Sequence, residues 1–375
     1  MKSFKNYLLH RIKSTWILTA VLCLFAIVIT ATTVKVYNYT YWETVYDEMA
    51  EKYDEMGESI KKEEVLRENV RVQNLGTIFY ILCGLCSVVP VLELSGLKNK
   101  RNADTIYSLP IDRRKMGAAH FTNGFLQILA VYLCMAVTAS IPLIKNGSEY
   151  LHLEFLPPLM LLPIPAALLL YAYYSYLFNE ANSTLDGCLF IASGTFMPLI
   201  LYATCQNYSY YENGVHVSTI LDKIDELASF PYFPIIKIVD VFDGGLRNLR
   251  VEHYYDKYDI LMITVWCVIG LLAAIGFYFT FDRKRVENIG SISSSWVGYK
   301  TSIPLCMFAI TSLVSYQSDL YLVVICAVVA VIGYMLYRKS FKLKWYDFAS
   351  IGGGIAAAIV CRMIEGISRY GGGSL

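Results

Sequence analysis

The sequence predicts an all-α, polytopic integral membrane protein on three observations. Of the 375 residues, 56% are hydrophobic and only 17% are charged, which is too little polar surface to cover one water-soluble body. Apolar runs recur along the chain at about the length that a helix needs to cross a bilayer, roughly 20 residues. Lysine and arginine gather beside some of these runs and not others, as in membrane proteins of fixed orientation.

About nine apolar runs are predicted to be membrane helices. The first is predicted to remain as an anchor, because it is longer than the apolar region of a signal peptide and lacks a clear small-residue cleavage site. The seventh is short, and it either spans with a tilt or re-enters the membrane. The runs are approximately Trp16 to Val36, Leu75 to Ser95, Ala118 to Ile144, Phe155 to Phe178, Leu185 to Tyr202, Ile260 to Phe281, Ile303 to Tyr316, Leu320 to Tyr337 and Phe348 to Ile364.

Basic clusters predict the orientation of these runs. They lie before the first run and after the second, sixth and eighth, so all of them fall on one side if every run spans. The turn after the fourth run is an exception, because it holds Glu180 and Asp186 and no basic residue. Since basic loops favour the cytoplasmic side, we expect a cell-membrane protein with a cytoplasmic N-terminus and, after nine spans, an extracellular C-terminus.

The loop between the second and third runs, residues 97–116, has the composition of a partner-binding loop. Its neutral core, Thr105 to Ile111, is flanked by six basic residues, Lys98, Lys100, Arg101, Arg113, Arg114 and Lys115. The core resembles the short cytoplasmic helix of bacterial type-2 ABC transporter permeases, in which Ser-Leu-Pro followed by a basic residue is frequent. The resemblance implies a short helix at Asp104 to Ile111 that docks an ATPase through Asp104, Thr105, Tyr107, Ser108, Leu109 and Pro110.

Two other segments extend the resemblance. Apolar residues recur at helical spacing among basic ones in residues 1–14, which predicts a cationic amphipathic helix on the inner leaflet, similar to the elbow helix of these permeases. After the sixth run, the stretch FDRKRVENIG resembles a pattern found in many Firmicutes permeases, a basic residue followed by Glu and Gly, here Lys284 or Arg285 with Glu287 and Gly290.

The resemblance covers nearly the whole chain and implies its domain organisation. Residues 15–281 would form a six-helix permease core, 282–302 a cytoplasmic linker, and 303–375 two or three further membrane helices. Glu93, near the inner end of the second run, is a candidate structural or coupling residue because a charge close to membrane depth is costly. Glu287 is a second candidate, on the resemblance alone.

Two outer segments separate the runs, at about residues 37–73 and 205–257. The first contains the near-repeat YDEMAEK and YDEMGES, which favours a solvated amphipathic helix over a coiled-coil contact with a second subunit. A metal role for its acidic residues is disfavoured, because no glycine stands at the spacing that a calcium-binding loop needs. The second contains the amphipathic stretch VHVSTILDKIDELASF and the apolar stretch FPIIKIVDVFDGGL, which is too short to span.

No catalytic constellation is recognisable in the sequence. There is no P-loop of the Gly-x-x-x-x-Gly-Lys-Ser/Thr type, so ATP and Mg are expected on a separate ATPase subunit and no cofactor on this chain. No His-Glu-x-x-His pair predicts a zinc site. The pair Cys83 and Cys86 has redox spacing, but it lies inside an apolar run and is interpreted as helix packing. The triple glycine at 352–354 is interpreted as a close helix approach.

These patterns predict the membrane-spanning subunit of an ATP-driven ABC transporter, an exporter by preference. Its partners would be cytoplasmic ABC ATPase subunits, a second permease copy or a paralogue, and membrane lipid, with no nucleic acid. Two alternatives stay open: a membrane enzyme acting on lipid or glycan, and a non-transporting membrane sensor or scaffold. The transported substrate is not encoded in a helical pattern that many exporters share.

Overall fold

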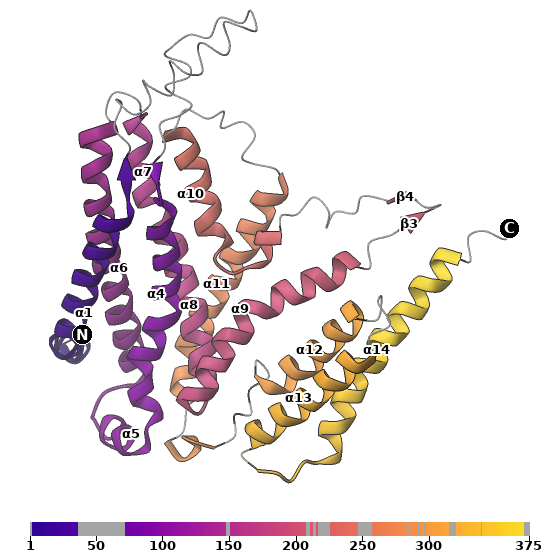
Figure 1. Cartoon of the computed structure of the whole chain (residues 1–375). Coiled ribbons are helices and arrows are strands. Elements are labelled where there is room, and N and C mark those ends of the chain that lie inside the picture. Colours follow the sequence, from indigo (N-terminus) through magenta and orange to yellow (C-terminus); the bar gives the residue numbers. More distant parts are fainter. Residues whose placement is uncertain are drawn as a thin grey trace, which may run out of the picture. The chain divides into compact units, whose positions relative to one another are not determined.

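The protein is described by a computed structural model over residues 2–36, 72–147, 151–207, 211–212, 215–216, 226–246, 257–283, 286–291, 293, 295, 298–314, 320–338 and 340–370. This part of the chain is mainly helical (Figure 1). Its strands form only two short antiparallel pairs, β1 (Lys35–Val36) with β2 (Val72–Gln73) and β3 (Tyr211–Glu212) with β4 (Val215–His216). The all-α fold class is therefore confirmed.

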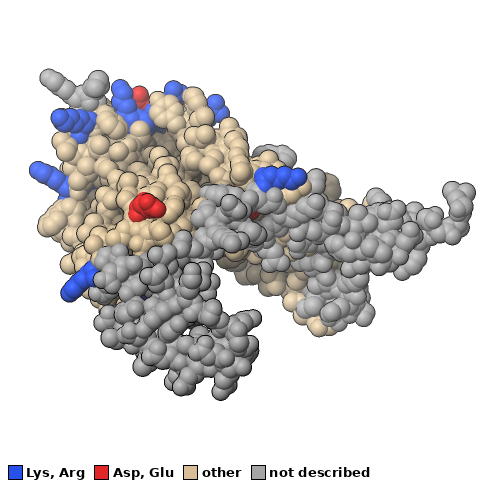
Figure 2. Space-filling model, turned by 90° about the horizontal axis from the view of Figure 1, so that it is seen from above, with Lys and Arg blue, Asp and Glu red and all other residues tan. Residues whose placement is uncertain are grey.

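Among the described residues, six segments are long and apolar enough to cross a membrane. They coincide with the first six predicted runs, which makes the protein a multi-pass membrane protein by length and composition. Figure 2 agrees, since uncharged residues make up most of the described surface in that view. The helices concerned are α1 (Lys2–Thr33), α4 (Gly76–Leu94), α6 (Arg113–Gly147), α8 (Pro163–Glu180) with η2 (Leu153–Phe155) and α7 (Leu156–Leu161) before it, α9 (Thr184–Asn207) and α11 (Lys257–Arg283).

The last three predicted runs are helices as well, α12 (Tyr299–Val314), α13 (Leu320–Arg338) and α14 (Trp345–Tyr370). They lie side by side in Figure 1, orange to yellow, and α12 packs on both of the others. With 16 residues, α12 is about 24 Å long at 1.5 Å per residue, less than the roughly 30 Å of a hydrocarbon core. The helix of the seventh run is thus too short to cross a hydrocarbon core of ordinary thickness.

The chain divides into two compact units. The first contains 1–89, 115–172 and 234–271, and the second contains 90–114, 173–233 and 272–375. The ends of α4, α8 and α11 therefore belong to the second unit with α12 to α14. The predicted division into a core at 15–281 and an appended region at 303–375 stays a prediction.

In the first unit, α1 is joined to α6 by a line of polar contacts. Tyr7 Oη lies 3.0 Å from His120 Nε2, and Asn123 Nδ2 donates to Thr15 Oγ1 at 3.2 Å. Residues 2–14 of the predicted elbow are the first turns of α1, which runs on to Thr33 without an interrupting Pro or Gly. In Figure 1 the first turns of α1, at the label N, are seen nearly end-on, whereas the rest of α1 runs up the view.

The predicted outer segments are described only in part. Residues 37–71, with the near-repeat, and 217–225, within the amphipathic stretch, lie outside the described residues; η4 (Glu226–Ser229) follows the latter. The apolar stretch predicted to be too short to span is α10 (Phe233–Leu246), a 14-residue helix. It is held to the start of α11 by an ion pair of 2.8 Å between Lys237 Nζ and Asp259 Oδ2.

Of the glycine triple at 352–354, only Gly354 makes the close helix approach that was predicted. A Cβ at Gly354 would lie 2.7 Å from the carbonyl oxygen of Pro304 on α12, whereas one at Gly352 or Gly353 would meet nothing within 4 Å. The packing of α14 on α12 therefore depends on the absence of a side chain at one position of three.

Gly354→Val is expected to destabilise the C-terminal helices by about 1–3 kcal/mol, because the added atoms force backbones apart. The measurement is the unfolding temperature of the purified protein in detergent. Gly353→Val is the matched control, with the same chemistry one residue away, and it should lower the temperature much less. Equal losses from the two variants would contradict the close approach.

Candidate functional site

The loop at 97–116 folds into two short helices and a turn. The 3-10 helix η1 (Ser95–Lys98) follows α4, and α5 (Lys100–Tyr107) comes next. The side chain of Asn99 accepts a hydrogen bond from the backbone N–H of Arg101 and so caps the start of α5. The turn from Ser108 then leads to α6, whose first turn is capped by Asp112 through the Arg114 N–H at 3.1 Å.

The predicted helix at Asp104 to Ile111 is therefore wrong at both ends. It begins four residues earlier, at Lys100, because Asn99 supplies an N-cap. It ends at Tyr107 because Pro110 lacks an N–H and restricts the backbone of Leu109. The Leu109–Pro110 step is a turn before the next helix and not part of the short one.

The six predicted docking residues do not share one environment. Asp104, Thr105, Ser108, Leu109 and Pro110 are exposed. Tyr107 is half-buried, lines a small cavity, and has the guanidinium of Arg113 5.1 Å from its ring centroid. The side of α5 opposite the exposed residues is anchored by Ala103, which is fully buried.

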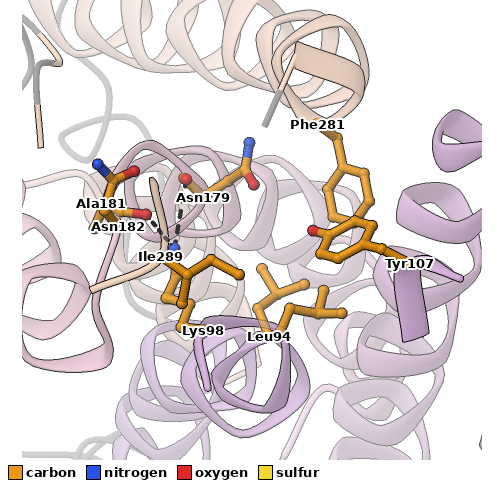
Figure 3. Close-up of a pocket in the computed structure, with 9 residues that line it drawn as sticks. Leu94, Lys98, Tyr107, Asn179, Ala181, Asn182, Phe281 and Ile289 are labelled. Atoms are coloured by element: carbon orange, nitrogen blue, oxygen red, sulfur yellow. Dashed lines mark hydrogen bonds between the residues drawn. The ribbon is translucent and has the colours of Figure 1, made fainter. Parts of the chain in front are cut away.

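Lys98, at the end of η1, joins this loop to the end of α8. Its ammonium group donates to the carbonyl oxygen of Ala181, lies 3.5 Å from that of Asn179, and sits 4.8 Å from the ring centroid of Phe178 (Figure 3). A cation at the C-terminal end of a helix is favoured by the helix dipole and by the carbonyls left without partners there. Lys98 thus brings a positive charge to the turn at 179–183, which has no basic residue of its own.

The segment after α11 closes on the same turn. The backbone N–H of Gly290 donates to the carbonyl oxygen of Asn182 at 2.9 Å, and the hydroxyl of Ser293 donates to that of Glu180 at 3.1 Å. Gly290 has φ of +79°, a conformation that glycine adopts without strain, which gives a structural reason for the glycine of the FDRKRVENIG pattern. Glu287 lies in η6 (Val286–Asn288), beside α5, and is exposed.

A half-exposed ion pair also links α6 to α11. Arg114 Nη2 lies 3.2 Å from Asp282 Oδ2, and the guanidinium is within 6 Å of the ring centroids of Tyr278 and Phe279. Exposed pairs of this kind contribute about 0–1 kcal/mol, so this one orients the junction more than it stabilises it.

Three segments therefore meet around Lys98, namely residues 95–114, the turn at 179–183, and residues 281–283 with 286–291; we call them the loop cluster. The cavity between them has a volume of about 30 Å³, room for a water molecule and nothing larger. Figure 3 shows Tyr107 and Phe281 on one side of it and Asn179, Ala181 and Asn182 on the other. The loop cluster is thus a closely packed junction of three segments around a cavity of about the size of a water molecule.

The C-terminal helices are tied to the same region. Tyr299, at the start of α12, donates its hydroxyl to Asp186 Oδ1 at 2.9 Å, and Tyr337 on α13 donates to the carbonyl oxygen of Ser293 at 2.8 Å. Burial and the hydrogen bond to Asp186 raise the pKa of the Tyr299 phenol above its ordinary value, so it stays a donor at neutral pH. The ends of α9, α12 and α13 accordingly meet beside the turn at 179–183.

Sequence reasoning missed the residues that hold the loop cluster together. Lys98 was predicted as one of the basic residues that flank the partner-binding loop and orient the chain. Asn179, which is 5% exposed and donates from Nδ2 to Thr280 Oγ1 at 3.0 Å, was not singled out. The signal for Lys98 was the lack of a basic residue in the turn after the fourth run. Glu93 is 3% exposed in α4, so its side chain is buried within the protein.

Among the described residues, no three His, Cys, Asp or Glu side chains gather where they could hold a metal ion, and the nine cysteines that can be assessed form no disulfide. Comparison with protein-family models, with curated proteins and with solved structures finds no match to this chain. Its function therefore has to be argued from the multi-pass fold and from the loop cluster.

Proposed function

We propose that this chain is the membrane-spanning permease subunit of an ATP-driven transporter of the type-2 ABC class, working as an exporter with separate cytoplasmic ATPase subunits. The observation that carries the proposal is the exposed side of α5, a short helix between two spans, with its opposite side fixed in the loop cluster. A partner that binds such a helix moves the attached spans and not only a loop.

In this proposal, the contacts of the loop cluster carry a displacement of α5 to the membrane helices. ATP binding draws the ATPase subunits together and displaces α5. Lys98 transmits this displacement to the end of α8, and the Arg114–Asp282 pair transmits it between α6 and α11. The permease acts as a homodimer or with a paralogous chain, and the loop cluster faces the cytoplasm together with the N-terminus, as the basic clusters favour.

Affinity purification of the tagged chain from its native membranes tests the proposal. An ABC ATPase with a P-loop should be recovered in stoichiometric amount, and the complex should hydrolyse ATP while the chain alone does not. Nucleotide turnover by the chain free of other subunits, or an enzymatic activity of the chain alone on lipid or glycan, would contradict the proposal.

A further inference from the structure

The turn between α13 and α14, Ser340 to Tyr346, combines exposed aromatic and cationic side chains. Phe341 is 90% exposed and Trp345 is 80% exposed, and Lys342 and Lys344 are exposed beside them. Burying two such rings is worth several kcal/mol in all, so leaving them in water is unfavourable. They stand at the end of two apolar helices, and in a membrane helix that is the position at which aromatic and basic side chains meet the bilayer surface.

A single buried carboxylate holds this turn in shape. Asp347, 2% exposed, accepts two hydrogen bonds from the guanidinium of Arg338, at 2.5 and 2.7 Å, and one from the backbone N–H of Lys344 at 2.9 Å. The end of α13 and the start of α14 are thereby fixed to one another. The aromatic and lysine side chains are displayed from a rigid base and need little further ordering on binding a ligand.

A cavity of about 340 Å³ opens beside the turn. Its lining includes the cationic Lys300 and Arg338 and the hydroxyls of Tyr346 and Ser350. The ring of Tyr346 has the Arg338 guanidinium 4.8 Å and the Lys344 ammonium 5.6 Å from its centroid. The surroundings of the cavity carry more positive than negative charge, since Asp347 is the acidic residue of its lining against two basic ones.

We propose that this turn and its cavity bind an anionic phospholipid. The cavity takes the phosphate-bearing headgroup, Lys342 and Lys344 supply the positive charge around it, and Phe341 and Trp345 lie among the upper acyl-chain carbons. Cationic groups beside aromatic ones at a membrane surface are the chemistry that recognises anionic lipid headgroups. The proposal needs α13 and α14 to lie in the membrane, as their sequences predict, and does not rest on the proposed transport function.

The test compares lipid binding by the purified full-length protein in detergent, measured by native mass spectrometry with dioleoyl-phosphatidylglycerol, dioleoyl-phosphatidylcholine or inorganic phosphate. Phosphatidylglycerol should bind at least several-fold more tightly than phosphatidylcholine, and inorganic phosphate should not compete for the site. The double variant Lys342→Gln with Lys344→Gln should bind phosphatidylglycerol about tenfold more weakly, since each lysine near an anionic lipid contributes measurably.

Lys35→Gln with Lys145→Gln is the matched control, because both lysines are exposed and lie outside this turn, and it should bind like the wild type. Phe341→Ala with Trp345→Ala should weaken the binding of both lipids. Equal binding of the two lipids by the wild type, or unchanged phosphatidylglycerol binding by the variant lacking Lys342 and Lys344, would overturn the proposal and leave the turn as a surface for a protein partner.

Discussion

If the proposed function is right, replacing Thr105 and Leu109 with aspartate is expected to abolish recovery of the ATPase with this chain. Both side chains are exposed on α5 and the turn that follows it, and each substitution places an unpaired charge in a contact that excludes water. Burying an unpaired charge costs several kcal/mol, which is enough to lower a micromolar affinity beyond detection by co-purification.

The choice of residues comes from the structure. Tyr107 is kept, because its ring lines the cavity of the loop cluster, and a charge there would disturb the junction and not only its partner. Thr105→Ser with Leu109→Met is the conservative control and should retain the ATPase. The unfolding temperature of the aspartate variant should stay close to that of the wild type. Normal ATPase recovery by that variant would show that α5 is not the docking helix.

In the proposed transporter, Lys98→Met is expected to leave ATPase binding intact but to prevent ATP hydrolysis from moving the membrane helices. The ATPase should still bind, because Lys98 faces the turn at 179–183 and lies outside the exposed side of α5. The carbonyls of Asn179 and Ala181 would lose a charged donor, at a cost of about 1–3 kcal/mol. We expect faster amide hydrogen exchange in residues 97–107 and 179–183, and a loss of ATP-driven transport of tenfold or more.

Lys100→Gln is the matched control for this variant. Lys100 lies two residues after Lys98, its side chain is exposed, and the substitution removes the same charge. It should leave hydrogen exchange in the turn at 179–183 unchanged. Arg114→Gln, which breaks a half-exposed pair, should have a smaller effect than Lys98→Met. If Lys98→Met leaves hydrogen exchange in the turn unchanged, the link between α5 and α8 is not what holds the junction together.

The membrane helices were predictable because hydrophobicity over about 20 residues is a property of the local sequence. All nine predicted runs are helices, and α10 is too short to span, as expected from its 14 apolar-rich residues. The bounds of α5 were predicted wrongly, because the helix was centred on the Ser-Leu-Pro core and the N-cap at Asn99 was not considered. With Asn99 as its N-cap, the helix begins four residues before the predicted start at Asp104.

The contacts of the loop cluster could not be predicted in the same way. Lys98 and Ala181 are 83 residues apart, and their meeting depends on where α4 and α8 end in space. The half-burial of Tyr107 could not be predicted for the same reason, since the direction of a side chain on a two-turn helix depends on what packs beneath it. Glu93 was placed correctly near a helix end, but its burial follows from packing that no local pattern encodes.

The most direct test of the proposed function is site-specific photo-crosslinking from α5 in native membranes. A photoreactive amino acid at Thr105 should crosslink to a protein that carries a P-loop, and the yield should change when ATP is added. The same group at Lys145, exposed near the far end of α6, should give no such product. Crosslinks from Thr105 to no ATPase, or equal ATPase crosslinks from both positions, would contradict the account.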